Sequence, residues 1–261
     1  MLIDINAYTG HWPFKQLRDN HCEGLLGRMK EYGVDLSVVT NLNGIFYKNT
    51  QSANEELYEE VRSKRAYRDR FLPFAIINPI YAGWKADFLT CVKDFGMKGI
   101  RVFPNYHDYT IDDPALLDLV KMARDHDVPV ALTMRVVDSR QRSWMDLAAE
   151  WAMKDYVPLV QAVPDAKYMM LNLSTGMALS AEQETVLKNA NVLFDTSGRH
   201  ITHFANVYRR FGKEKFAFGS HFPVFDYYTG LLRIESLRPE EAEEADRALF
   251  CSGNARRFLK V

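Results

Sequence analysis

The chain has 261 residues, of which 47% are apolar and 26% charged, as is usual for a folded globular domain. Its 33 basic and 34 acidic residues give a net charge of −1, and no basic block marks a nucleic-acid-binding surface. No segment approaches the ~18 apolar residues of a membrane span. The three cysteines are far apart and lack CxxC spacing, and the first residues do not form a secretory signal. We therefore expect a single cytoplasmic domain, residues 1–261, without nucleic-acid or membrane partners.

Eight short runs rich in β-branched and aromatic residues recur along the chain. Several are almost unbroken in apolar residues, which is typical of parallel strands that are covered on both faces. The predicted strands are Leu2–Tyr8, Val34–Leu42, Phe71–Asn78, Lys98–Pro104, Val128–Arg135, Tyr168–Ser174, Asn191–Ser197 and Lys215–His221.

Helical patterns lie between these strands. Asp112-Asp113-Pro114 is a helix start, and Ser180–Gln183 forms a capping box. The predicted helices are Glu23–Tyr32, Ala115–His126, Thr185–Ala190, Pro239–Phe250 and Asn254–Leu259.

The spacing of these elements predicts the fold. Eight strands in 261 residues give about 33 residues for each strand-and-helix unit, which matches a (β/α)8 barrel. A doubly wound open sheet is the alternative, but its glycine-rich first turn is replaced here by Thr9–Pro13. We predict a single α/β domain, a (β/α)8 TIM barrel.

Chemistry in such a barrel lies where the strands end, and alternate residues point inward. The predicted strand ends carry several polar side chains. They are Asp4, Asn6, Tyr8, Arg101, Thr133, Arg135, Asn172, Ser174, Asp195, Ser197 and His221.

Several segments resemble those of the amidohydrolase superfamily, in its branch of decarboxylases and lactonases. Their order and spacing cover nearly the whole chain. The segments are Ile3–Asn6 with Trp12–Phe14, Gly99–Pro104, Val128–Thr133, Phe194–Gly198, Gly219–Pro223 and Gly253–Phe258. The resemblance implies a barrel of amidohydrolase type.

The chain departs from this family at the metal ligands. The family has a His-x-His pair where Asn6 and Tyr8 stand, histidines where Thr133 and Asn172 stand, and an aspartate in place of His221. Zinc and manganese need imidazole, carboxylate or thiolate donors. We therefore predict no metal cofactor. The alternative is a divalent metal such as zinc in a relocated site made of His221 and the loop histidines, His11, His107, His200 and His203.

The resemblance suggests roles for these residues. His221 would activate water, Arg101 and Arg135 would hold a substrate carboxylate, and Tyr8 or Asn6 would stabilise the oxyanion. His221 could instead be a histidine satisfied by neighbouring backbone. The arginines could instead form ion pairs with Asp4 or Asp195. The other predicted substrate contacts are Thr133, Asn172, Ser174, Trp12 and His107.

The function that the resemblance implies is hydrolysis of an ester, lactone or amide bond in a small anionic or hydroxylated molecule. Decarboxylation is the less favoured reaction. The alternative, supported by the lost ligands, is an inactive relative that binds a metabolite or a protein partner. The resemblance also implies a possible homodimer.

Overall fold

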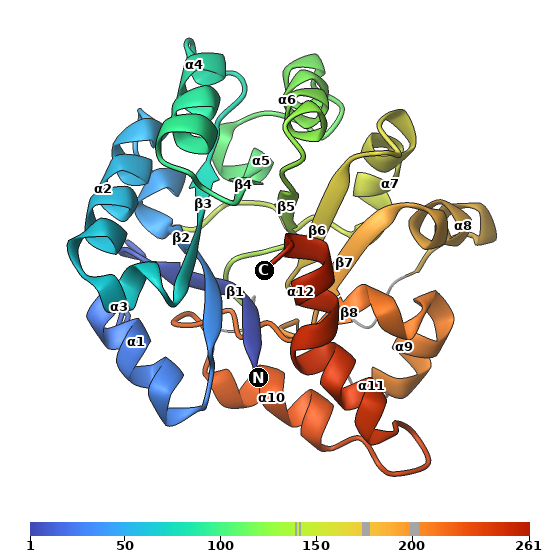
Figure 1. Cartoon of the computed structure of the whole chain (residues 1–261). Coiled ribbons are helices and arrows are strands. Elements are labelled where there is room, and N and C mark those ends of the chain that lie inside the picture. The colour runs from blue at the N-terminus through green and yellow to red at the C-terminus, as the bar shows by residue number, and fades with distance from the viewer. Residues whose placement is uncertain (139, 141, 174–177, 199–203) are drawn as a thin grey trace.

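The computed structural model describes residues 1–138, 140, 142–173, 178–198 and 204–261. Eight parallel strands form one sheet in sequence order, with each strand paired to the next. Figure 1 shows the strands gathered at the centre of a ring of helices. The strands are β1 (Ile3–Thr9), β2 (Leu36–Asn41), β3 (Phe71–Ile76), β4 (Gly99–Val102), β5 (Val130–Thr133), β6 (Lys167–Leu171), β7 (Asn191–Asp195) and β8 (Phe216–Ala217).

The last strand returns to the first and closes the barrel. The amide of Ile5 donates to the carbonyl of Phe218 at 3.0 Å, and that of Tyr8 donates to Phe222 at 2.8 Å. In the opposite direction, the amide of His221 donates to the carbonyl of Asn6 at 2.6 Å. These bonds confirm the predicted single (β/α)8 barrel and bring Asn6 and His221 side by side.

Helices cover the outside of the barrel (Figure 1). Within the described residues, none is both long and apolar enough to cross a bilayer. The α-helices are α1 (Cys22–Glu31), α2 (Thr50–Ser63), α3 (Arg65–Arg68), α4 (Trp84–Leu89), α5 (Pro104–His107), α6 (Pro114–Asp125), α7 (Met153–Ala162), α8 (Ala181–Asn189), α9 (Phe204–Phe211), α10 (Tyr227–Glu235), α11 (Glu244–Ala248) and α12 (Asn254–Leu259). Shorter 3-10 and π-helical turns are η1 (Leu42–Ile45), η2 (Thr90–Asp94), η3 (Lys213–Lys215) and η4 (Leu249–Gly253).

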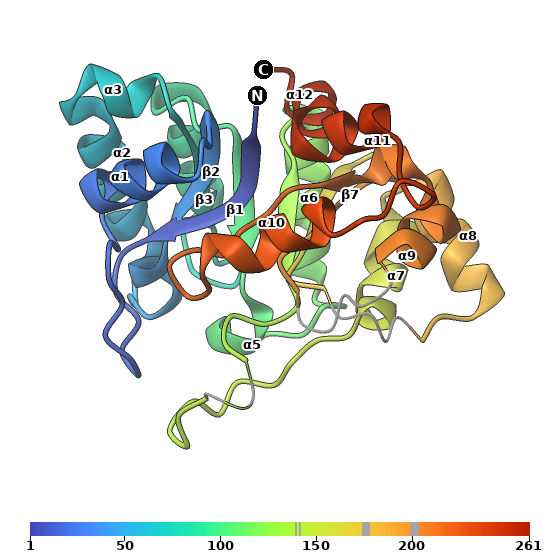
Figure 2. The same cartoon turned by 90° about the horizontal axis from the view of Figure 1, so that it is seen from below.

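The two ends of the barrel differ in chemistry. At the amino-terminal ends of the strands, apolar side chains such as Ile3, Ile5 and Met169 pack with Ala255 and Phe258 of α12. Helix α12 therefore closes this end of the barrel over an apolar core. Figure 2 shows both chain termini at that end, with α5 and the long segment after β5 at the other. The polar end of the barrel is thus the one at which the strands finish.

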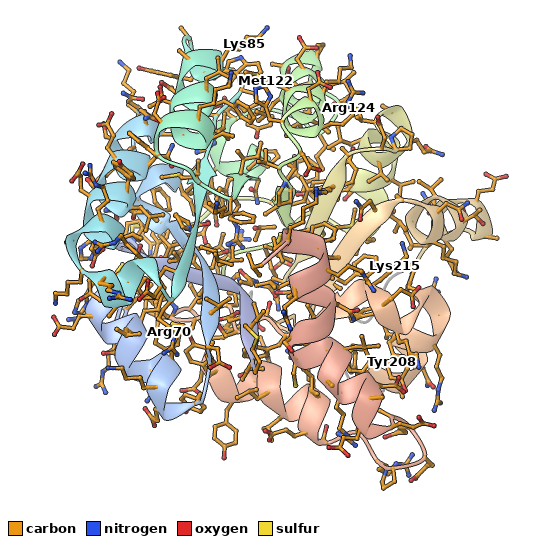
Figure 3. All side chains as sticks on the ribbon, viewed as in Figure 1. Arg70, Lys85, Met122, Arg124, Tyr208 and Lys215 are labelled. Carbon is orange, nitrogen blue, oxygen red and sulfur yellow. The ribbon has the colours of Figure 1, made fainter. Side chains whose placement is uncertain are left out.

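Polar groups on the outer layer tie the helices to the barrel. Figure 3 labels Lys215, whose ammonium donates to the carbonyl of Ala190 at 2.7 Å and to that of Leu187 at 3.2 Å. Partial burial lowers the pKa of this lysine. Its two acceptors lie at the end of α8, where helix carbonyls lack intrahelical partners.

All eight predicted strands are confirmed, but several end earlier than predicted. Asn172 and His221 have φ values of 57° and 60°, which a strand cannot contain. The sixth and eighth strands therefore stop before these residues, and Ser174 lies outside the described part of the chain. The predicted helix Pro239–Phe250 is wrong at its start. Its helix begins at Glu244, because the capping-box contact between the Glu243 amide and the Asp246 carboxylate sets the first turn there.

Two helical glycines give opposite predictions for stability. A Cβ on Gly230 of α10 would lie 2.3 Å from the carbonyl oxygen of Gly219, whereas one on exposed Gly27 of α1 would meet nothing within 4 Å. We expect Gly230→Ala to lower the free energy of unfolding by about 1–3 kcal/mol through overpacking. Gly27→Ala should raise it by about 0.5–1 kcal/mol. Urea unfolding of both variants tests this, and equal effects would contradict the packing of α10 on the end of the barrel.

Candidate functional site

The side chain of Asn6, on β1, lies at the centre of a buried polar network. Its amide nitrogen donates to Asp195 Oδ2 at 2.6 Å and to Ser197 Oγ at 3.0 Å, and lies 3.1 Å from His221 Nδ1. Its amide oxygen accepts from Arg101 Nη2 at 2.7 Å. Asn6 therefore links strands β1, β4 and β7 to the segment after β8.

Arg101, on β4, brings a fully buried guanidinium to this network. Its Nε donates to Thr133 Oγ1 at 2.8 Å, and its Cζ lies 4.2 Å from the centroid of the Tyr8 ring. Burial lowers the pKa of Arg101, while Tyr8 and Asp195 act in the opposite direction. Neither Arg101 Nη1 nor the Tyr8 hydroxyl has a hydrogen-bond partner among the described residues. Two buried donors thus remain open at the centre of the site.

His221 follows β8 and points its ring into the same network. Its Nε2 lies 2.6 Å from the carbonyl oxygen of Val136, which assigns the proton to that nitrogen and leaves the lone pair on Nδ1, 3.1 Å from the Asn6 amide nitrogen. Its ring also meets Tyr8 edge to face, with centroids 5.0 Å apart. Burial, and then the charge of Arg101, lower the pKa of His221 to about 3, so the imidazole is neutral at physiological pH.

Asn172 and His221 share an uncommon backbone conformation. Both have a positive φ without being glycine, and the Asn172 amide nitrogen lies 3.2 Å from His221 Nε2. Asn172 also donates to the carbonyl of Arg135 at 3.0 Å, whereas its Oδ1 has no partner in the described ranges. Such conformations cost about 1–3 kcal/mol and cluster at functional sites.

Two buried carboxylates stand beside the network. Asp195 accepts from the backbone N–H of Asn172 at 2.8 Å as well as from the Asn6 side chain and the Ser197 hydroxyl. Burial raises its pKa, and the hydrogen bond from Ser197 is the largest opposing effect. Asp4 accepts from the Ser220 amide at 2.9 Å and the Ser220 hydroxyl at 2.5 Å. Burial raises the pKa of Asp4 to about 6.

Arg135 does not form the ion pair with Asp4 or Asp195 that the sequence offered as one alternative. Its guanidinium nitrogens lie 3.5 Å from Asp138 and 3.8 Å from Glu150, rather than next to Asp4 or Asp195. Sequence reasoning missed both of these acids, although the three-residue spacing from Arg135 to Asp138 is a usable signal. The backbone partner that the sequence allowed for His221 is the carbonyl of Val136, and the sequence gives no signal for that particular residue.

The predicted rim residues Trp12 and His107 are buried beside the network. Trp12 packs edge to face with Phe46 at 5.2 Å between centroids. His107 Nε2 lies 3.2 Å from the Gly44 carbonyl, and burial lowers the pKa of His107 to about 4. Phe103 connects this wall to the guanidinium, since its ring centroid lies 5.7 Å from Arg101 Cζ.

The site residues do not fit a divalent metal. The aligned positions offer two amides, a phenol, a hydroxyl and one imidazole, and a guanidinium cation stands among them. In the part of the chain that the structure describes, no three His, Cys, Asp or Glu residues come together as ligands. His200 and His203, proposed for a relocated site, lie outside that part.

Comparison with known proteins places the chain in a family. The amidohydrolase family matches residues 26–261, and the chain therefore belongs to this family. A sequence comparison with curated proteins finds no match.

Solved structures with this barrel carry several activities. An amidohydrolase described as putative, from Staphylococcus aureus, has 17% identity and a TM-score of 0.75, with 100% of this chain and 99% of that one covered. A dihydroxybenzoic acid decarboxylase from Polaromonas, with bound manganese and 2-nitroresorcinol, has 15% identity, coverage of 99% and 96%, and a TM-score of 0.69. 4-Oxalomesaconate hydratase from Rhodopseudomonas palustris has 17% identity, coverage of 100% and 96%, and a TM-score of 0.72. At these identities the likeness shows the fold.

The raised pKa of Asp4 predicts how the free energy of unfolding depends on pH. Its carboxyl binds a proton more tightly in the folded chain than in the unfolded one, so the stability it contributes is lost as pH rises from about 4 to about 6. Relative to Asp4→Asn, the wild type should lose on the order of 3 kcal/mol over that window. Asp118→Asn, an exposed change on α6, controls for the removed charge. Parallel stability curves for wild type and Asp4→Asn, measured by urea unfolding at each pH, would contradict the assignment.

Proposed function

We propose that this chain is a hydrolase of the amidohydrolase family that acts on an ester, lactone or amide bond of a small anionic or hydroxylated metabolite, without a metal centre. The observation that carries the proposal is the pair of buried donors, Arg101 Nη1 and Tyr8 Oη, that lack partners among the described residues beside a neutral imidazole. A buried donor without a partner costs about 1–3 kcal/mol, and a ligand oxygen would recover this cost.

In this scheme Arg101 and Tyr8 would donate to the substrate oxygen that gains charge in the transition state. Donors that are fixed in advance in a buried site stabilise an oxyanion more strongly than mobile ones in water. The Tyr8 hydroxyl keeps its proton, because burial raises its pKa to about 12. It would therefore serve as a hydrogen-bond donor at neutral pH.

His221 would take the proton from the attacking water. Its Nδ1 carries the lone pair, so the contact with the Asn6 amide must open before water reaches it. Part of the depression of its pKa comes from Arg101, and an anionic substrate beside Arg101 would counter that part. Asn6 holds both Arg101 and His221, which makes it a positioning residue as well as the oxyanion donor first expected.

The remaining predicted contact residues would bind the rest of the substrate. Asn172 Oδ1 is a buried acceptor without a partner in the described ranges, which suits a substrate hydroxyl. Arg135 would receive a carboxylate in competition with Asp138 and Glu150. Thr133, Ser174, Trp12 and His107 stay proposed contacts. A dihydroxybenzoic acid and 4-oxalomesaconate, named for two relatives, are small carboxylic acids, which supports an anionic substrate.

The second candidate is an inactive relative that binds a metabolite or a protein partner. One observation favours it: both ring nitrogens of His221 are already engaged, by Val136 and Asn6. Such a ring stabilises the fold without any catalytic part. Cytoplasmic location and a homodimer stay predictions under either candidate.

A ligand screen followed by turnover assays separates the two candidates. Small hydroxylated acids, lactones and esters would be screened by thermal shift, and every hit assayed for product. We expect His221→Gln to lower kcat by at least about 100-fold while the hit still binds, because only the base is removed. His126→Gln, at the far end of α6, should keep wild-type turnover. Full activity in His221→Gln would show that His221 is not the catalytic base. Ligands that bind without being converted to product would favour the second candidate, the inactive binding protein.

A further inference from the structure

Three side chains surround the guanidinium of Arg101, and the sequence resemblance aligns all three with metal-ligating residues of the family. Asn6 Oδ1 accepts from Nη2 at 2.7 Å, Thr133 Oγ1 accepts from Nε at 2.8 Å, and the Tyr8 ring centroid lies 4.2 Å from Cζ. The other two such positions, Asn172 and His221, lie together beyond the opposite end of the Asn6 amide. The guanidinium is therefore enclosed by three of these five positions and linked to the other two through Asn6.

The charge of this guanidinium has a buried counterpart. The amide of Asn6 turns its oxygen to Arg101 and its nitrogen to Asp195, so its dipole is aligned between the cation and the carboxylate. Both charged side chains are essentially inaccessible to water, where an unpaired ion is costly. The other charged or titratable groups around this pair are Asp4 and Tyr8 of β1, Arg135 after β5, His221 after β8 and Arg233 of α10.

We propose that the guanidinium of Arg101 is the resident cation of this site and takes the place that a divalent metal holds elsewhere in the family. The inference deepens the proposed metal-free function. A cation bonded to the chain needs no carboxylate or imidazole ligands, which accounts for amide, hydroxyl and phenol groups at those positions. A second cation beside it would be repelled, and the donors that remain are weak ligands for zinc or manganese.

The guanidinium also keeps one position open, as a catalytic metal does. Nη1 has no hydrogen-bond partner in the described ranges, and neither does the hydroxyl of Tyr8, the residue whose ring the guanidinium faces. A carboxylate or carbonyl oxygen of the substrate is the ligand that these two donors fit. Arg101 would therefore both balance Asp195 and polarise the substrate.

Metal binding by the wild-type protein is the first test. Purified wild-type protein and the His221→Gln variant would each be dialysed against MnCl2 or ZnCl2, and the metal content of the two proteins compared. We expect less than about 0.1 ion per chain to depend on His221, and no change in melting temperature on adding EDTA. One ion per chain that is lost in His221→Gln would overturn the proposal.

Charge coupling between Arg101 and Asp195 is the second test, and it does not depend on activity. Without the guanidinium, the pKa of Asp195 rises further in the folded chain. The folded state therefore loses more stability, relative to the unfolded state, as the pH is raised. We expect Arg101→Met to lower the melting temperature by about 5 °C more at pH 8 than at pH 5. Adding Asp195→Asn should remove this difference, and Arg101→Lys should restore part of the stability at pH 8.

A matched control is Arg70→Met. Arg70, labelled in Figure 3, donates to the carbonyls of Val34 and Asp35 and lies outside the network. Its loss should lower the melting temperature by the same amount at both pH values.

The outcomes of the charge-coupling test are distinct. Additive effects of Arg101→Met and Asp195→Asn on the melting temperature, equal at pH 5 and pH 8, would contradict the proposal. If Arg101→Met does not fold at pH 8 but folds at pH 5, the coupling is supported. If coupling holds and no substrate turns over, only the proposed hydrolase function fails.

Discussion

The amide of Asn6 joins two buried charges, and the whole polar end of the barrel depends on this contact. It accepts from the guanidinium of Arg101, donates to the carboxylate of Asp195 and holds one nitrogen of His221. A carboxamide can do this because one small group carries two N–H donors and an acceptor oxygen. One residue type therefore accounts for a site arranged around a side-chain cation.

The backbone conformation also helps to form this polar network. Asn172 directly follows β6 and His221 lies a few residues after β8, and both adopt left-handed conformations that bring their side chains together. Closure of the barrel fixes the second of them, since the His221 amide donates to the Asn6 carbonyl. The opposite end, filled with apolar side chains under α12, supplies the rigid base on which this strain can be held.

The strands and the barrel could be predicted from the sequence because apolar runs and their spacing are local signals. The inward polar residues followed from alternation, and this placed Asn6, Arg101 and Thr133 together correctly. What could not be predicted is how the groups pair. The acceptor of His221 is a backbone carbonyl, that of Val136, and backbone groups are the same at every position. The acids near Arg135 come from a long segment after β5, whose path depends on tertiary contacts rather than on a periodic pattern.

The central claim is that a guanidinium, and not a metal ion, is the cation of this site. Crystals grown with 5 mM MnCl2, with anomalous data collected above the manganese edge, test it most directly. The account predicts the Arg101 side chain in density between Asn6 and Thr133 and no anomalous peak near His221. An anomalous peak within coordination distance of His221 and Asn172, with Arg101 displaced from Asn6, would contradict it.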